Sequence, residues 1–379
     1  MGDGVENIEL IDQTNATTRN AIYTLSNTRY TLGGFVYNAE ANWNNALLQD
    51  IWLLTLIRSG LDPVMRDTLF SGMGSSMAAV GNVVEKSSNT LNKRLGDLRL
   101  SQLYRETEGH TPANGLWFRQ YAGHSVLDAF GSTKVNTYGL EFGYDHQLSL
   151  DIPAKVYLGA VAGASFASAN DRRMDSDITG QSLGLYALFL HDSGWFIDAT
   201  ARHHWLNLET TVRSGLAGAE SDSYDKNTRA WAFSLEAGKQ WTWKMDDTWS
   251  MMLEPRIEYN HTTINGFSAR LNDIASRVEQ YDSSLLSGGV YWGLRHEAEN
   301  QPVYEPYLKL NVKHEFDGKV RVKADTESGR ANLSGTRGEV GLGLNAKLGN
   351  NFSLYGEAAY EKGSRVESVG GNLGLRFEF

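Results

Sequence analysis

The sequence predicts an all-β fold, a 12-stranded antiparallel transmembrane β-barrel with an N-terminal α-helix threading the lumen. Three observations predict it. The 379 residues include 39 Gly, 10 Trp, 17 Tyr, 14 Phe and only 6 Pro, which is typical of strands and their turns. From about Gly115 to the last residue, apolar and polar side chains alternate in one segment after another. A stretch rich in small and helix-favouring residues precedes these segments.

Composition excludes several classes of function. Lys plus Arg number 35 against 45 for Asp plus Glu, a formal charge of -10, which argues against nucleic acid as a partner. The absence of cysteine rules out thiolate metal sites and cysteine nucleophiles, and fits a compartment such as the periplasm or cell envelope. No phosphate-binding or dinucleotide motif is present, so we expect no cofactor and no metal.

Hydropathy excludes helical membrane spans but not a barrel. No run of 18 consecutive apolar residues occurs, and the mean hydropathy is -0.39. A β-barrel averages out as polar because its strands alternate lipid-facing and lumen-facing residues. The first ten residues lack a basic region followed by an apolar stretch, so we expect any export signal to lie upstream.

The chain divides into three parts that differ in residue pattern. Residues 1–60 contain short β-like segments, such as Arg29 to Ala39 and Asp50 to Ile57, and resemble a fragment of something larger. Residues 61–112 are expected to form a linker and a pore-spanning helix, and residues 113–379 the barrel.

The helix is expected between about Asp62 and Leu103, above all from Ser75 to Arg99. Val83, Leu91, Leu95 and Leu98 recur there at helical spacings. Residues 75–99 as a helix extend roughly 37 Å, enough to thread a hydrocarbon layer of about 30 Å. A 12-stranded barrel is larger than barrels whose interior is filled by side chains and smaller than barrels with an open channel. Its lumen should therefore admit about one helix. The alternative is a solvated helix docked on a soluble domain.

Twelve alternating segments follow, an even number as a closed bacterial barrel requires. In the last one, Leu373, Leu375, Phe377 and Phe379 point to one face, and the residues between them to the other. A single such strand is more often the edge of a soluble sandwich, but twelve in succession favour a membrane barrel. The segments start near residues 115, 134, 153, 178, 194, 228, 248, 283, 302, 336, 352 and 369.

Several of these features together resemble a known family. The stretch Asn89 to Arg99 (NTLNKRLGDLR), a barrel opening with Leu116 to Arg119, and a terminal aromatic-x-Phe are similar to the translocator domain of classical monomeric autotransporters. The similarity is greatest to the adhesin-type group that includes the diffuse-adherence adhesin. Residues 29–57 resemble the last rungs of a passenger β-solenoid.

The resemblance implies a function and a location. The chain would be an outer-membrane translocator of a Gram-negative bacterium that exports a covalently attached upstream passenger to the cell surface, with the helix plugging the pore. It would lie in outer-membrane lipid and meet periplasmic chaperones and the barrel-assembly machinery. Gly371, Phe377 and Phe379 would form the assembly signal. An ordinary lipid-facing aromatic is the alternative for Phe379.

The serine-protease autotransporters add an expectation about self-cleavage. In those proteins an Asn cyclises at an Asn-Asn pair before a Leu-Asn-Lys-Arg motif. Asn89 matches the first Asn, but Thr90 replaces the second, so we favour no catalysis. By the same resemblance Asp198 would activate the Asn, and Glu236 and Glu258 would govern helix packing or gating. The helix residues expected to take part are Asn89, Asn92, Lys93, Arg94, Asp97 and Arg99.

Two other classes of function remain open at this point. An outer-membrane enzyme, a protease or lipase, would need clustered Asp and His in loops, whereas the nine His are scattered. A plain porin gives no reason for the helix motif, and a soluble lectin-like protein gives no reason for an apolar face on every strand. We therefore expect a translocator without enzymatic activity, apart from the disfavoured self-cleavage.

Overall fold

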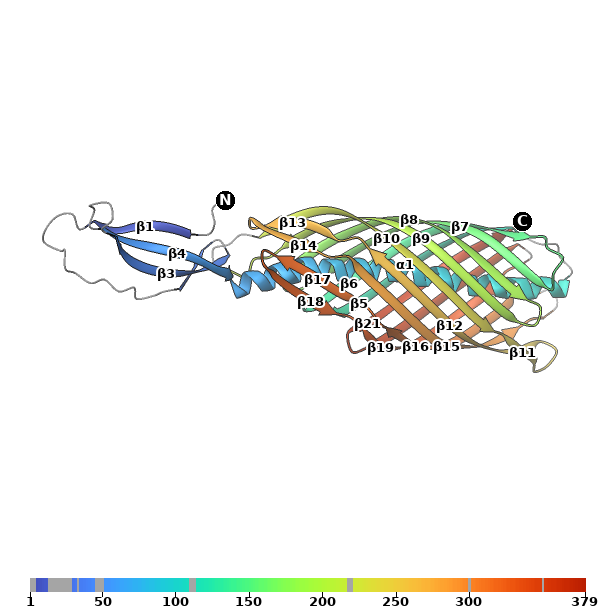
Figure 1. Cartoon of the computed structure of the whole chain (residues 1–379). Helices are drawn as coiled ribbons and strands as arrows, with labels where there is room; N and C mark the ends of the chain where they lie inside the picture. Colours follow the sequence, from blue (N-terminus) through green and yellow to red (C-terminus); the bar gives the residue numbers. More distant parts are fainter. Residues whose placement is uncertain are drawn as a thin grey trace.

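The computed structural model describes residues 5–12, 29–32, 34–44, 51–108, 114–216, 221–298, 301–349 and 351–379; for 5–12, 41–44, 51–54 and 89–108 it describes the backbone alone. The chain forms a small N-terminal sheet, one long helix and a closed barrel, in that order (Figure 1).

Four strands form the N-terminal sheet, with the order β1-β4-β3-β2 and every pairing antiparallel. Their bounds are β1 (Val5–Asp12), β2 (Arg29–Leu32), β3 (Phe35–Asn44) and β4 (Ile51–Leu61). The chain passes from β4 directly into the helix through Asp62. That this segment ends a passenger stays a prediction.

Helix α1 (Pro63–Glu108) is 46 residues long, and it begins earlier and ends later than the stretch from Ser75 to Arg99. Its start has a local cause. The Asp62 carboxylate accepts a hydrogen bond of 2.8 Å from the backbone N–H of Val64, and Pro63 occupies the first helical position, where no N–H is needed. Among the described residues, no helix is both long and apolar enough to cross a membrane.

Twelve long antiparallel strands form the barrel, as the sequence predicts. The last strand pairs with the first along its whole length, from Val366 opposite Leu127 to Glu378 opposite Gly115. The sheet therefore has no free edge, which is what a lipid environment demands. The strands are β5 (Gly115–Asp128), β6 (Ser132–Leu148), β7 (Ala154–Asn170), β8 (Met174–His191), β9 (Trp195–Val212), β10 (Asp222–Lys239), β12 (Trp249–Ile264), β15 (Tyr281–His296), β16 (Val303–Glu315), β19 (Gly335–Lys347), β20 (Phe352–Gly363) and β21 (Val366–Glu378).

The two ends of the barrel differ in their connections. At one end the turns are short, and the short strand β11 (Trp241–Lys244) extends the pairing of β12. At the other end two long hairpins stand up from the wall. Because outer-membrane barrels have short periplasmic turns and longer extracellular loops, the hairpin end is the extracellular end. The C-terminus lies at the opposite, periplasmic end (Figure 1).

The two hairpins join into a second four-stranded sheet, which we call the cap. It has the order β13-β14-β17-β18 and consists of β13 (Phe267–Leu271), β14 (Ile274–Val278), β17 (Lys319–Ala324) and β18 (Glu327–Asn332). The cap is not among the elements predicted from the sequence. One hairpin turns through Asn272 and Asp273, whose φ angles of 46° and 61° fit the two-residue turn that suits strand twist.

Helix α1 runs inside the barrel along its length (Figure 1). Its first turns form the main apolar cluster of the molecule, with Met65, Leu69, Met73 and Met77 at most 1% exposed. Cap residues Leu271, Ile274, Val278, Val320 and Val322 belong to the same cluster. The lumen at the extracellular end is thus filled by side chains from helix, wall and cap.

Candidate functional site

Small residues let the helix lie close to the wall near the extracellular end. A Cβ atom on Gly72 would come within 2.6 Å of Val212 on β9, and one on Gly74 would overlap the Phe130 ring in the turn between β5 and β6. The Tyr224 hydroxyl is 2.6 Å from the Ser76 Oγ and donates to the carbonyl oxygen of Gly72 at 3.3 Å. The helix therefore passes close to the wall where its own side chains are small.

Halfway along the helix the contacts become charged. The Glu85 carboxylate accepts a hydrogen bond of 2.8 Å from the Arg337 guanidinium on β19, and the Lys86 ammonium donates to the Ser368 Oγ on β21, also at 2.8 Å. Lys86 lines a small cavity of about 50 Å³ together with Glu339 and Glu361. Two neighbouring helix residues of opposite charge thus face the same sector of the wall.

That sector carries an ordered set of charges, which we call the charge ladder. Lys309 and Lys313 on β16 each pair with Glu339 on β19, at 3.0 and 2.6 Å, and reach Glu357 and Glu361 on β20 at 2.8 and 2.7 Å. Arg337 joins Glu361 at 3.0 Å and completes the ladder of three cations and three acids. Buried charges are tolerated when they are paired, so the ladder is a wall of paired charges on which Glu85 docks.

On the other side of the helix, Ser87 meets a second ion pair. Arg202 on β9 and Glu141 on β6 are 2.6 Å apart and at most 2% exposed. The Arg202 guanidinium also donates to the carbonyl oxygen of Ser87 at 3.1 Å and to the Ser182 Oγ at 2.8 Å. Residues 85 to 87 are therefore held from β6, β9, β19 and β21 at once.

The three acids anticipated from the sequence lie side by side on the inner wall. Glu236 on β10 is directly opposite Asp198 on β9 and Glu258 on β12 in the strand register. Asp198 and Glu236 are buried, and Glu258 is half-buried. Arg256 lies 3.6 Å from Glu236 and 3.4 Å from Glu254, and Glu258 accepts a hydrogen bond of 2.7 Å from Asn260. We call Asp198, Glu236 and Glu258 the acid row.

The helix residues singled out from the sequence lie in α1, but their side chains are outside the described part of the structure. These are Asn89, Thr90, Asn92, Lys93, Arg94, Asp97 and Arg99. The self-cleavage and helix-recognition roles expected of them stay predictions. The docking of residues 85 to 87 is not predicted from the sequence. The available signal is that Glu85 and Lys86 are the only charged residues between Thr68 and Asn92.

The residues of the expected assembly signal lie on β21 and at its end. Phe377 and Phe379 face outward, are more than half exposed, and stack with ring centroids 6.2 Å apart. Phe379 also stacks on Tyr144 of β6 at 6.5 Å, and its backbone N–H donates to the carbonyl oxygen of Asn114 at 3.0 Å. Gly371 pairs with Ala122 in the register between β21 and β5.

Within the described ranges, no group of three or more His, Asp or Glu side chains is arranged to hold a metal ion. The contacts of Glu85, Lys86 and Ser87 define the candidate site as a helix held in a polar lumen, an arrangement suited to occupying a pore.

Comparisons with known proteins agree with this geometry. The family model described as "Autotransporter beta-domain" matches residues 116–359. The chain is 32% identical over 286 residues to the pertactin autotransporter of Bordetella parapertussis, covering 74% of this chain and 29% of pertactin. It is 29% identical over 208 residues to the autotransporter adhesin/invasin TibA of Escherichia coli O78:H11, covering 54% of this chain and 20% of TibA. The chain thus spans less than a third of the length of these relatives.

A solved structure supports the fold. The transport unit of the autotransporter AIDA-I from Escherichia coli superposes with a TM-score of 0.61 at 19% identity, covering 70% of this chain and 90% of that one. The resemblance drawn from the sequence is confirmed, and with it the location in the outer membrane of a Gram-negative bacterium. The chain belongs to the autotransporter β-domain family.

Proposed function

We propose that this chain is the transport unit that exports a linked passenger polypeptide through the outer membrane to the cell surface. One observation carries the proposal: α1 lies inside a closed barrel and continues, at the extracellular end, into β4. A polypeptide that crosses the barrel from the periplasm to the surface must occupy the path that α1 occupies. The helix is then the last part of the exported segment and remains as a plug.

Contacts at the extracellular end support a defined exit. The Glu327 carboxylate in the cap accepts hydrogen bonds from the Leu61 backbone N–H at 3.1 Å and from Arg66 at 3.2 Å. Arg58 of β4 lies 3.4 Å from Asp325, in the turn before β18. The cap thus holds the junction between the N-terminal sheet and the helix. With residues 1–60 as the end of the passenger, 61–112 as linker and helix, and 113–379 as translocator, the cap guides the passenger away from the pore.

The lower half of the helix is proposed to pair with the acid row. Ser87 lies at the level of Arg202, and Asp198 lies four residues further along β9 toward the periplasm, roughly 10 Å along the axis of a tilted strand. Lys93 and Arg94 follow Ser87 by six and seven residues, about 9 to 10 Å of helix rise. This level matches that of the acid row, so these cations are suited to neutralise it.

We propose that export is powered by passenger folding outside the cell, and that the chain is a conduit and not an enzyme. Its named relatives include an adhesin/invasin, so the proposed passenger is of the adhesin type. Periplasmic chaperones and the barrel-assembly machinery are the proposed partners on the way to the membrane.

Surface exposure of a reporter tests the export proposal. A signal peptide and an epitope-tagged soluble reporter are placed ahead of Met1, and intact cells are treated with protease. We expect the reporter to be clipped from outside while the barrel stays heat-modifiable on gels. A reporter that remains in the periplasm beside a properly inserted barrel would refute transport.

The assembly signal is tested separately on the outward face of β21. We expect Phe379→Ala to lower the folded, heat-modifiable fraction in cells, because its aromatic ring is outward and more than half exposed and so is available to a recognition protein. Leu373→Ala, on the same face of the same strand, is the matched control. Equal losses for both variants would assign Phe379 to lipid contact alone.

A further inference from the structure

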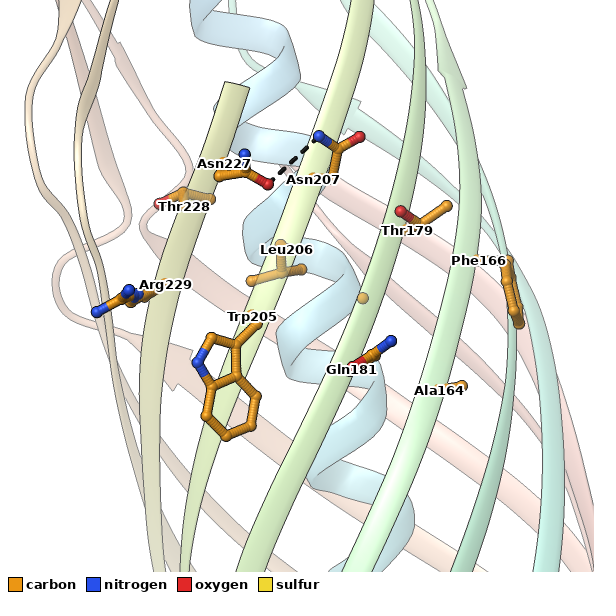
Figure 2. Close-up of a pocket in the computed structure, with 11 residues that line it drawn as sticks. Ala164, Phe166, Thr179, Gln181, Trp205, Leu206, Asn207, Asn227, Thr228 and Arg229 are labelled. Carbon is orange, nitrogen blue, oxygen red and sulfur yellow. Dashed lines mark hydrogen bonds between the residues drawn. The ribbon is translucent and has the colours of Figure 1, made fainter. Parts of the chain in front are cut away.

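A groove of about 630 Å³ lies on the outer wall of the barrel, away from the lumen. It crosses the four neighbouring strands β7 to β10 (Figure 2). Phe166 and Trp205 contribute aromatic rings that are 49% and 41% exposed, and the polar side chains around them come from three strands. These are Thr179, Gln181, Asn207, Asn227 and Arg229.

Strand register arranges the outward side chains of the groove in two rows. The upper row runs Phe166, Thr179, Asn207 and Asn227, each directly opposite the next. The lower row runs Ala164, Gln181, Trp205 and Arg229 in the same way. Ala164 leaves room between the larger side chains. The result is a surface that combines amide groups, one indole and one guanidinium.

The groove lies where the outer wall changes from apolar to polar. On β8, outward positions pass from Leu185 and Leu183 to Gln181 and then Asp177 toward the extracellular end. On β10 they pass from Phe233 and Trp231 to Arg229 and then Asp225. Because the hydrocarbon band ends where outward side chains stop being apolar, both rows lie at headgroup level in the outer leaflet.

Polar groups in the groove have bonding capacity to spare. Within the part of the chain that the structure describes, neither the Arg229 guanidinium nor the Gln181 amide makes a side-chain hydrogen bond. The Asn207 amide donates to Asp225 at 2.6 Å and to the Asn227 side-chain oxygen at 3.4 Å (Figure 2). The N–H groups of the Asn227 amide therefore point away from Asn207.

The charges set the orientation of any anionic occupant. Asp177, Glu209 and Asp225 lie opposite one another in the row just above the groove and are exposed. They repel a phosphate on the extracellular side, whereas Arg229 in the lower row attracts one. Trp205, opposite Arg229, offers a flat apolar face to a sugar ring, and the apolar wall below offers a path for acyl chains.

We propose that this groove binds the phosphorylated glycolipid of the outer leaflet, the acylated sugar lipid known as lipid A. A phosphate lies beside Arg229, the sugar packs on Trp205 and bonds to Gln181 and Asn227, and acyl chains run down past Leu183. Position, charge and the mixed lining all match this lipid. A phospholipid offers the phosphate and the chains but no sugar for the indole and amides.

Native mass spectrometry of the full folded chain in detergent micelles tests the proposal. The probes are bisphosphorylated lipid A, the same lipid without phosphates, and phosphatidylglycerol. We expect one retained bisphosphorylated lipid A per barrel and weaker retention of the other two probes. Arg229→Gln and Trp205→Leu should each weaken lipid A binding by roughly tenfold, the scale of one charge-assisted contact.

Matched variants separate the groove from general lipid contact. Lys134→Gln removes another exposed cation on an outward position of β6, and Trp292→Leu removes another exposed indole on β15; both should bind as the unchanged chain does. Gln181→Leu keeps the wall compatible with lipid and should still lose affinity. Heat-modifiable migration confirms that each variant is folded. Equal binding of phosphatidylglycerol, or equal losses in the control variants, would overturn the proposal.

Discussion

Glu85 in the helix and Arg337 in β19 are 252 positions apart in the chain, and their side chains meet at 2.8 Å inside the barrel. Arg337 also binds Glu361 of the charge ladder, so one guanidinium joins the helix to the wall. Glu85 therefore fixes the height of the helix in the lumen, since a shift of one turn would move its carboxylate about 5 Å away.

Loss of this guanidinium should destabilise the barrel markedly. Arg337→Ala removes the partner shared by the buried Glu361 and the half-buried Glu85, at a cost of about 3 kcal/mol. Urea unfolding in lipid vesicles measures the change. Lys362→Ala, which removes the cation of an exposed pair with Glu367, should have no measurable effect. Equal stabilities for Arg337→Ala and the unchanged chain would contradict the proposed anchoring.

The close contact between Gly74 of the helix and the Phe130 ring leads to a second prediction. Gly74→Ala places a methyl group into the Phe130 ring and should lower the free energy of unfolding by about 1 to 3 kcal/mol. Adding Phe130→Ala should restore part of the loss, because the obstructing ring is gone. Gly131→Ala is the control, since a Cβ there meets nothing within 4 Å. Failure of Phe130→Ala to relieve the loss would show that the contact is not its cause.

The absence of cysteine gives a direct test of the helix level in the lumen. Lys93→Cys combined with Glu236→Cys introduces two thiols into a chain that otherwise has none. A short bifunctional thiol reagent should link them if, as proposed, Lys93 lies at the level of the acid row, to which Glu236 belongs. Lys93→Cys combined with Ser368→Cys is the control, since Ser368 lies at the level of Lys86. More efficient linking in the control would mean that the helix sits at another height.

No cleavage is expected at Asn89. Thr90 replaces the second Asn of the self-cleaving motif, so the mass of a reporter-bearing chain should remain that of the intact polypeptide. Asn89→Asp and Asp198→Asn should leave this mass unchanged as well. Mass spectrometry of purified outer membranes gives the answer. A fragment that ends at Asn89 and disappears in Asp198→Asn would establish catalysis instead.

One pH effect is expected in the cap, outside the membrane. A hydrogen bond from Lys323, 2.6 Å away, holds the pKa of Glu279 below its ordinary value of 4.5. A lowered carboxyl pKa stabilises the fold above pH about 4.5, and this stabilisation is lost as pH falls through the folded-state pKa. Lys323→Gln should therefore reduce the fall in unfolding midpoint between pH 5 and pH 3. An identical pH profile for both proteins would exclude this linkage.

The sequence predicts the existence of the barrel more accurately than it predicts where each strand begins and ends. The first barrel segment is expected near residue 115 and starts at Gly115, whereas β10 starts at Asp222 and not near 228. The reason is physical. Outward residues such as Asp225 and Asn227 lie above the hydrocarbon, where nothing requires them to be apolar, so the alternation disappears although the strand continues.

The contacts of the site depend on the register between strands that are far apart in the chain. The residue pattern of a single strand does not determine this register. The three acids of the acid row are identified by resemblance, but their alignment through Glu236 follows from the register of β9, β10 and β12. The cap is not predicted from the sequence because each of its strands is only five or six residues long. Alternation in Phe267, Ala269 and Leu271 around the Asn272 turn is the signal that was available.

The seam between β21 and β5 sets an order of events in biogenesis. Strand β21 follows the other barrel strands in the chain and is synthesised after them, while α1 precedes β5 and lies inside the finished ring. A ring that closed first would leave the helix outside, facing an opening narrowed by the cap. Enclosure must therefore accompany closure, with the strands wrapping around a segment already in transit, and a chain lacking β21 is left with two exposed sheet edges and no sealed passage.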